Sequence, residues 1–127
     1  MDKLYQIKIG KQLIGLTRFE KADAPMGVVF GEIISKNVTI DYNSIKTIAK
    51  QSKANITYDY EEDELISIYE IPNLKIISPT GIEIKGLGHE ISGMNEEGFE
   101  ITILGIPYPF YEEEFPHHVE EYRKLHA

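Results

Sequence analysis

The densest set of metal-ligating side chains lies near the carboxyl end of the chain, between residues 112 and 121. Two histidines, His117 and His118, stand among glutamates there, and imidazole with carboxylate is a ligand set that zinc and other divalent ions accept. The spacing argues against a site, because adjacent histidines point about 100° apart on a helix and no second histidine follows four residues later. We expect a surface helix whose first acidic turn suits the helix dipole, with no metal and no cofactor.

Two further residues have side chains suited to a chemical role. His89 stands beside Glu90 and has the side chain of a general base, but no motif in the sequence supplies a nucleophile for it. Arg18 precedes the polar segment 20–27, and loops on a rigid sheet often carry binding residues. One hypothesis is therefore a small-ligand-binding protein or metal-dependent enzyme with a pocket near Arg18, His89 or His117.

Acidic residues accumulate in the second half of the chain. Residues 1–58 carry nine Lys and Arg against five Asp and Glu, a balance of +4, whereas residues 59–127 carry four against sixteen, a balance of −12. Tyrosines, which supply rigid amphipathic contact area at interfaces, accompany the acidic runs. We expect the following residues to form a partner-binding surface: Asp59, Tyr60, Glu61, Glu62, Asp63, Glu64, Glu96, Glu97, Tyr108, Tyr111, Glu112, Glu113 and Glu114.

Such a surface suits a basic protein partner, with fast and salt-sensitive association. The net charge of −8 and the presence of only two arginines argue against nucleic-acid binding, because phosphates would be repelled over most of the surface. In size, acidity and lack of cysteine the chain is similar to small bacterial immunity proteins, which neutralise a nuclease toxin. We therefore favour a protein-binding inhibitor over an enzyme. A third hypothesis is a structural or assembly subunit of a homo-oligomer, in which residues 108–115 pack against a second copy.

Length and composition indicate an ordinary globular protein. The 127 residues, 42% hydrophobic and 27% charged, predict a single domain over residues 1–127. Residues 1–8 alternate polar and apolar side chains, without the basic start and apolar run of a secretory signal. No stretch reaches the ~20 apolar residues of a membrane span, so we expect a cytoplasmic protein without membrane contact.

Short strands separated by turn residues must position these side chains. Residues 10–11 predict a two-residue hairpin turn, and residues 78–81 place Pro and Gly where a β-turn favours them. After residue 54 the pattern predicts a meander of three hairpins. The expected extended segments are 5–9, 13–19, 28–34, 38–42, 55–60, 64–71, 74–77, 82–85, 90–94 and 99–106.

Two helices complete the predicted fold. Residues 43–53 have one apolar and one lysine-bearing helical face, with Asp41 or Asn43 as the N-cap. Pro116 suits the first turn of a closing helix to about Leu125, whose expected inner stripe is Phe115, Val119, Tyr122 and His126. The chain therefore predicts an α+β fold with mainly antiparallel β-sheet, in a roll or sandwich-like arrangement, one short central helix and a C-terminal helix.

Overall fold

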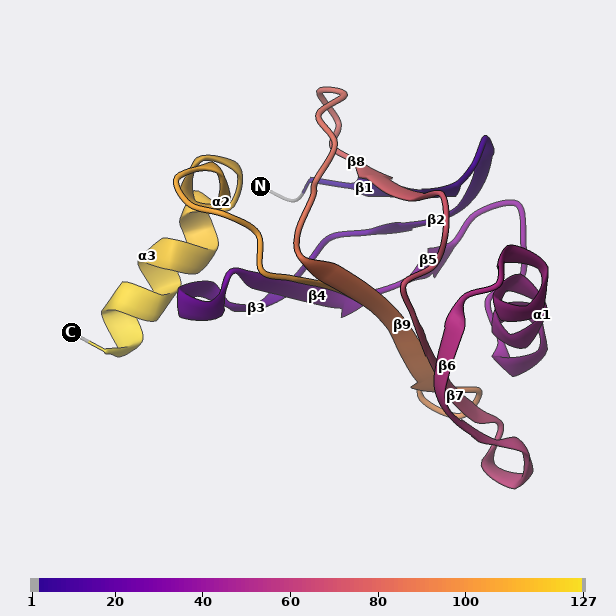
Figure 1. Ribbon diagram of the computed structural model, residues 1–127. Coiled ribbons are helices and arrows are strands. Elements are labelled where there is room, and N and C mark those ends of the chain that lie inside the picture. The colour runs from indigo at the N-terminus through magenta and orange to yellow at the C-terminus, as the bar shows by residue number, and fades with distance from the viewer. Residues whose placement is uncertain (1–2, 127) are drawn as a thin grey trace.

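The computed structural model describes residues 3–126, and its strands form two antiparallel sheets (Figure 1). The four-stranded sheet has the order β5-β2-β1-β8. Its strands are β1 (Tyr5–Ile9), β2 (Gln12–Thr17), β5 (Ile34–Ser35) and β8 (Leu74–Ile77). Ile9 pairs with Gln12 across residues 10–11, which confirms the two-residue turn predicted there.

The second sheet has six strands in the order β3-β4-β10-β9-β7-β6. Its strands are β3 (Lys21–Asp23), β4 (Val28–Glu32), β6 (Asn55–Tyr60), β7 (Leu65–Tyr69), β9 (Gly88–Met94) and β10 (Gly98–Leu104). The β6–β7 and β9–β10 hairpins were both predicted, and β7 pairs with β9. The short 3-10 helices η1 (Ala24–Met26) and η2 (Glu61–Asp63) connect β3 to β4 and β6 to β7.

The three α-helices of the described residues lie at the ends of the sheets, α1 at one end and α2 with α3 at the other (Figure 1). They are α1 (Tyr42–Ser52), α2 (Phe110–Glu114) and α3 (Pro116–Leu125). Helix α1 begins with a capping box, in which the Ser44 N–H donates to Asp41 Oδ1 at 2.8 Å and the Asp41 N–H donates to Ser44 Oγ at 2.9 Å. Asp41 is therefore the N-cap, one of the two candidates from the sequence. No helix in residues 3–126 is long and apolar enough to cross a membrane.

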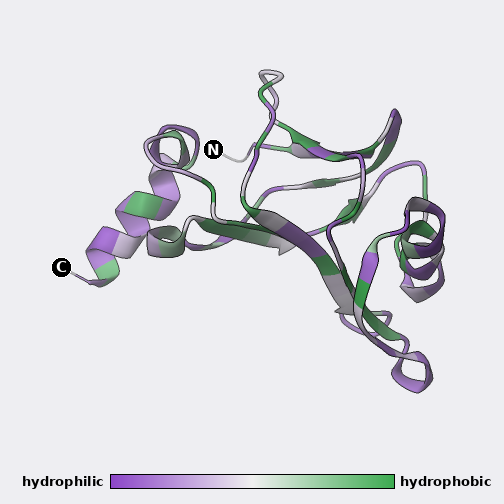
Figure 2. Ribbon diagram, in the orientation of Figure 1, coloured by the Kyte–Doolittle hydropathy of each residue, from purple (hydrophilic) through white to green (hydrophobic). Residues whose placement is uncertain are grey.

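The hydrophobic core lies between the two sheets and extends to the helices. Ile7 and Ile76 of the four-stranded sheet and Ile68, Ile91 and Ile101 of the six-stranded sheet are almost completely enclosed. In Figure 2 hydrophobic and polar residues interchange along the strands, as expected for strands with one face on a core. The predicted α+β fold, mainly antiparallel with a C-terminal helix, is confirmed.

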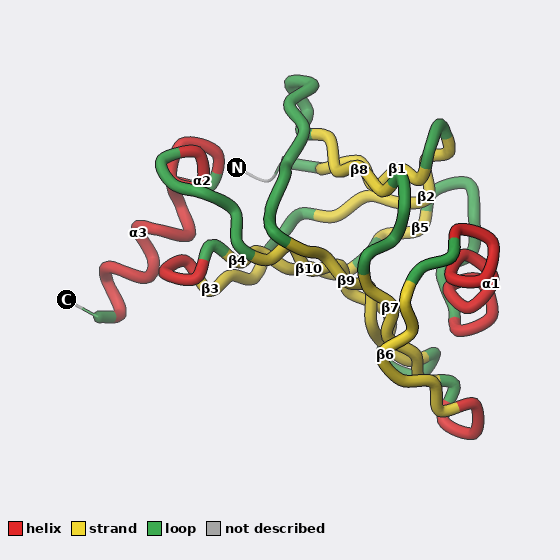
Figure 3. The backbone as a smooth tube through the Cα atoms, in the orientation of Figure 1, coloured by secondary structure: helices red, strands yellow, loops and turns green. Residues whose placement is uncertain are grey.

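The predicted meander differs from the structure at its middle hairpin. Residues 74–77 form β8, which pairs with β1 in the other sheet, while residues 82–85 contribute only a bridge between Ile77 and Glu83. The turn between them forms as predicted, since the Gly81 N–H donates to the Ser78 carbonyl at 2.9 Å. The long β8–β9 connection then carries the chain from one sheet to the other (Figure 3).

Three other segments differ from the sequence prediction. Residues 20–27 are not a loop but hold β3 and η1, and residues 38–41 are not a strand. The inner face of α3 carries Phe115, Val119 and the buried His118, whereas Tyr122 and His126 are exposed. The His118 side chain packs inward because its Nε2 hydrogen-bonds to the Phe19 carbonyl oxygen at 2.7 Å, which satisfies a polar group that burial would otherwise penalise.

Candidate functional site

Two acidic turns lie side by side at one end of the six-stranded sheet. The first holds Glu61, Glu62, Asp63 and Glu64, and the second holds Glu96 and Glu97; we call these six residues the acidic tip. They meet because β7 pairs with β9, and Asn95 joins them: its N–H donates to the Glu64 carbonyl at 3.2 Å and its Nδ2 to Glu64 Oε2 at 3.0 Å. All six side chains are exposed, and the η2 end of the β6–β7 hairpin is hydrophilic in Figure 2.

The face of the six-stranded sheet that turns away from the core continues this surface. Paired residues of an antiparallel sheet share a face, so the strand register defines three rows on it, which we call the outer face. The rows are Phe30-Thr102-Glu90-Tyr69, Glu32-Glu100-Ser92-Ser67-Tyr58 and Gly98-Met94-Leu65-Tyr60. Within residues 3–126 no helix covers this face, because α1 packs on the core side of β7 and α3 lies at the β3 edge (Figure 1).

Tyrosines gather on the β6–β7 side of the outer face. Tyr60 is 56% exposed and Tyr69 is 38% exposed. The rings of Tyr58 and Tyr60 stack, with centroids 5.6 Å apart and an interplanar angle of 28°. Stacking holds both rings in place, so they present apolar area to a partner at a small cost in side-chain entropy.

A hollow of about 450 Å³ interrupts the outer face between β3 and β6. Its lining includes Glu32, Glu97, Glu100, Lys21 and Tyr58. The Lys21 ammonium lies 2.8 Å from a Glu100 carboxylate oxygen and over the Phe30 ring. This exposed pair leaves carboxylates in excess, so the hollow is acidic.

Asp59 was predicted to belong to the partner-binding surface, but it does not lie on the outer face. It pairs with Ile66 on the core side of β6, turned toward α1. Its carboxylate accepts a short hydrogen bond from the Tyr42 hydroxyl and lies 2.9 Å from the Lys46 ammonium. The Tyr42 hydrogen bond, followed by that of Lys46, lowers the pKa of Asp59, so this charge is already compensated within the protein.

The predicted residues at 108–114 lie far from the acidic tip, near the opposite edge of the six-stranded sheet (Figure 1). Tyr111 and Glu114 are buried, and the Tyr111 hydroxyl donates to the Val28 carbonyl at 2.8 Å. Tyr108 stacks on Tyr111, and Glu112 lies 3.3 Å from Arg123. Glu113 is exposed. The sequence left open whether the acidic runs share one face; in the structure they lie on two separate surfaces, and only the acidic tip adjoins the outer face.

A pocket of about 380 Å³ is lined by Arg18 and His117, two of the three residues named in the small-ligand or enzyme hypothesis. At its base the Tyr5 hydroxyl donates to Glu114 Oε2 at 2.6 Å, and the Lys3 ammonium lies 3.2 Å from the same oxygen. Burial, then this hydrogen bond, raises the pKa of Tyr5. These groups satisfy one another and tie α2 to β1. Among residues 3–126 no three His, Cys, Asp or Glu side chains converge as metal ligands.

His89 lies apart from that pocket, on the core side of β9. Its Nε2 accepts a hydrogen bond from the Ile71 N–H at 2.9 Å. Burial lowers the pKa of His89, which keeps the ring neutral and suited to accept this bond. The geometry is that of a structural histidine joining β9 to the end of β7.

Sequence reasoning missed the carboxylates in the strands, Glu32, Glu90 and Glu100. Each of these glutamates is next in sequence to a buried residue and therefore points to the other face of its strand. Glu100, for example, precedes the buried Ile101. That alternation was a usable signal, but it does not tell which strands are neighbours.

Comparisons with protein-family models, with curated proteins and with solved structures gave no match.

Proposed function

We propose that the protein is a small acidic protein-binding module that docks on a basic partner through its outer face and acidic tip. The observation that carries the proposal is an uncovered sheet face on which Tyr58, Tyr60 and Tyr69 stand beside carboxylates. Tyrosine is among the residues that most often dominate binding energy at interfaces.

The charge of this surface supports a basic partner. Six exposed carboxylates form the acidic tip, and Glu32, Glu90 and Glu100 add to them along the outer face. Within the described residues one ion pair on this surface, Lys21 with Glu100, offsets a single charge. A surface of one sign attracts an oppositely charged protein over a distance of about 10 Å at 0.1 M salt and speeds association.

The partner class that fits this chemistry best is a nuclease-like toxin domain, as for a bacterial immunity protein. An enzyme that binds nucleic-acid phosphates needs a cationic surface, and carboxylates on a sheet can occupy the positions of those phosphates. In this proposal the protein acts in the cytoplasm, a reducing compartment in which the lack of cysteine is ordinary.

The test is a titration with the purified protein encoded beside this gene and with a panel of inactive nuclease-toxin domains. We expect a one-to-one complex that weakens as salt is raised. Tyr60→Ala should weaken it about tenfold or more, the scale of an interface hot spot. Tyr122→Ala is the matched control, because Tyr122 is also exposed and lies among carboxylates, but on α3.

Glu62→Lys should slow association, while Glu113→Lys on α2 should leave it unchanged. Binding to none of these basic proteins, or equal losses for Tyr60→Ala and Tyr122→Ala, would overturn the proposal. If light scattering shows a stable oligomer and Tyr60 is covered by a second copy in it, the assembly-subunit hypothesis is favoured instead.

A further inference from the structure

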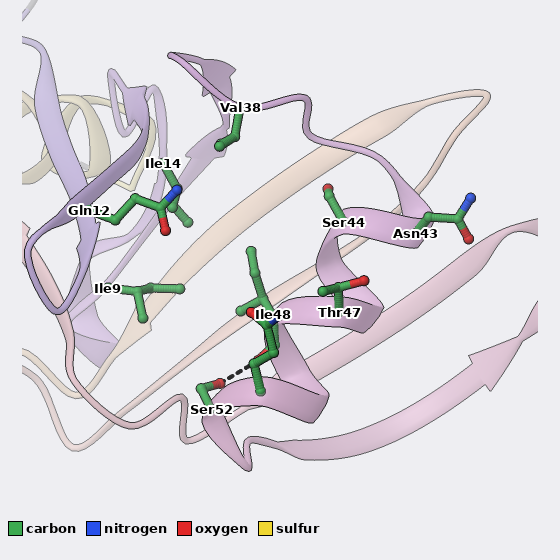
Figure 4. Close-up of a pocket in the computed structure, with 10 residues that line it drawn as sticks. Ile9, Gln12, Ile14, Val38, Asn43, Ser44, Thr47, Ile48 and Ser52 are labelled. Carbon is green, nitrogen blue, oxygen red and sulfur yellow. Dashed lines mark hydrogen bonds between the residues drawn. The ribbon is translucent and has the colours of Figure 1, made fainter.

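A second hollow, of about 480 Å³, opens between α1 and the β1–β2 hairpin (Figure 4). It exists because α1 is fixed against the other sheet: Tyr42, Ile45 and Ala49 are buried in the core, and the helix makes its main contacts with β7. The adjoining face of the helix then looks toward the hairpin across open space. Ile48 faces Ile9 and Ile14 in this way.

The floor of the hollow is aliphatic. Ile14 is buried, whereas Ile9, Val38 and Ile48 are half-buried and pack against the core only on one side. These side chains leave apolar area in contact with water, and covering it with another apolar group is favourable at roughly 25 cal/mol per Å². The hollow is thus a place where the core is open to a second molecule.

The walls are polar without any charge. Gln12, Asn43, Thr47 and Gln51 line the hollow, and within residues 3–126 their side chains have no hydrogen-bond partner in the protein. Ser44 and Ser52, in contrast, are used by the helix itself, since Ser52 Oγ donates to the Ile48 carbonyl (Figure 4). Amides and hydroxyls on the wall are therefore available to a ligand.

The charges of α1 lie outside the hollow. Lys46 is held by Asp59 at 2.9 Å, and neither Lys50 nor Lys53 belongs to the lining. Within residues 3–126, all ten lining residues are uncharged in a chain that is 27% charged. An ionic ligand would lose water there without gaining a counter-ion, which is costly.

We propose that this hollow is a binding site for an uncharged amphipathic small molecule. Its apolar body would cover Ile9, Val38 and Ile48, and its polar end would meet the amides of Gln12 or Gln51. The volume lies within the range of about 300–1,000 Å³ that small-molecule sites occupy. The site is distinct from the outer face, because α1 packs on the core side of the six-stranded sheet.

Two dyes of nearly the same shape test this proposal. N-phenyl-1-naphthylamine is neutral, whereas 8-anilino-1-naphthalenesulfonate carries the same two ring systems and a sulfonate. We expect the fluorescence of the neutral dye to rise on titration and to saturate at one dye per chain. We expect the sulfonate dye to bind at least about tenfold more weakly than the neutral dye, because no described lining residue pairs with its charge.

Variants on one helix locate the binding. Thr47 is exposed and lines the hollow, so Thr47→Trp should fill it and weaken binding of the neutral dye about tenfold or more. Lys50→Trp introduces the same side chain at an exposed position outside the lining and should leave binding unchanged. Should Thr47→Trp unfold the chain, Gln12→Glu on the hairpin replaces it and should also weaken binding.

Three outcomes of the dye titrations would overturn the proposal. They are no saturable binding of the neutral dye, equal binding of the two dyes, and undiminished binding by every folded variant that alters the lining. A doubled mass by light scattering, abolished by Thr47→Trp, would show that a second copy covers the hollow and would also overturn it.

Discussion

At the scale of single residues, Glu114 is the carboxylate most completely enclosed by the described chain, and its partners are Tyr5 and Lys3. The Tyr5 ring packs on Phe19 and Phe115, with centroids 5.1 and 5.6 Å away. Tyr5→Phe keeps this packing and removes only the hydroxyl. We expect the free energy of unfolding to fall by about 1–3 kcal/mol, the cost of a lost hydrogen bond to a charged group.

Urea unfolding measures this loss. Tyr122→Phe is the control, because Tyr122 is partly exposed on α3. If Tyr5→Phe is as stable as the control, the hydroxyl does not stabilise the buried carboxylate.

His89 gives a second residue-scale prediction, on pH. Burial lowers its pKa from the usual 6.5, so between the two values the unfolded chain binds a proton that the folded chain does not. The contribution of neutral His89 to the free energy of unfolding is therefore complete above about pH 6.5 and is lost as the pH falls below that value. We expect the free energy of unfolding to decline from pH 7.5 to 5.5.

His89→Gln should flatten that decline, because an amide oxygen still accepts from the Ile71 N–H but does not titrate. His117 also has a lowered pKa, chiefly through burial. The variant His117→Gln therefore measures how much His117 contributes to the pH dependence of the free energy of unfolding. A His89→Gln variant with the unchanged pH profile would refute the assignment.

At the scale of elements, the capping box of α1 has a measurable role. Asp41→Ala removes the acceptor for the Ser44 N–H and should lower the free energy of unfolding by about 0.5–2 kcal/mol. Asp41→Asn keeps an acceptor oxygen and should stay close to the original protein. Urea unfolding followed by circular dichroism measures the free energy of unfolding of both variants. If Asp41→Asn and Asp41→Ala lose the same amount, the charge of Asp41 matters more than the hydrogen bond from the Ser44 N–H.

At the scale of the whole molecule, the acidic tip opposes folding by self-repulsion. Six exposed carboxylates meet at one end of a chain whose net charge is −8. Salt screens exposed charges, so raising NaCl from about 0.01 to 0.5 M should increase the free energy of unfolding by some tenths of a kcal/mol, the scale of exposed ion interactions.

The double variant Glu62→Gln/Glu96→Gln removes one charge from each turn. It should be more stable than the original protein at low salt and gain less from added salt. A matched variant, Glu113→Gln/Glu120→Gln, should change this response less, because those residues lie at the other end of the molecule. The same salt response in both would contradict a local repulsion at the tip.

The sequence by itself determined the local structure. Period-two alternation, turn residues such as Pro79 and Gly81, and the cap at Asp41 act over a few residues, so they located most strands, two of the later hairpins and the central helix. It also determined the surplus of acids after residue 58 and the turns that carry the acidic tip.

Tertiary structure alone decided which strands are neighbours. The pairing of β8 with β1, and the burial of His118 and Glu114, depend on contacts between residues far apart in the chain, such as Tyr5 with Glu114. The pairing of β7 with β9 brought the acidic turns together, while strand order left residues 108–114 near the opposite edge. Both hollows arise between elements, so the types of their lining residues were visible in the sequence but their convergence was not.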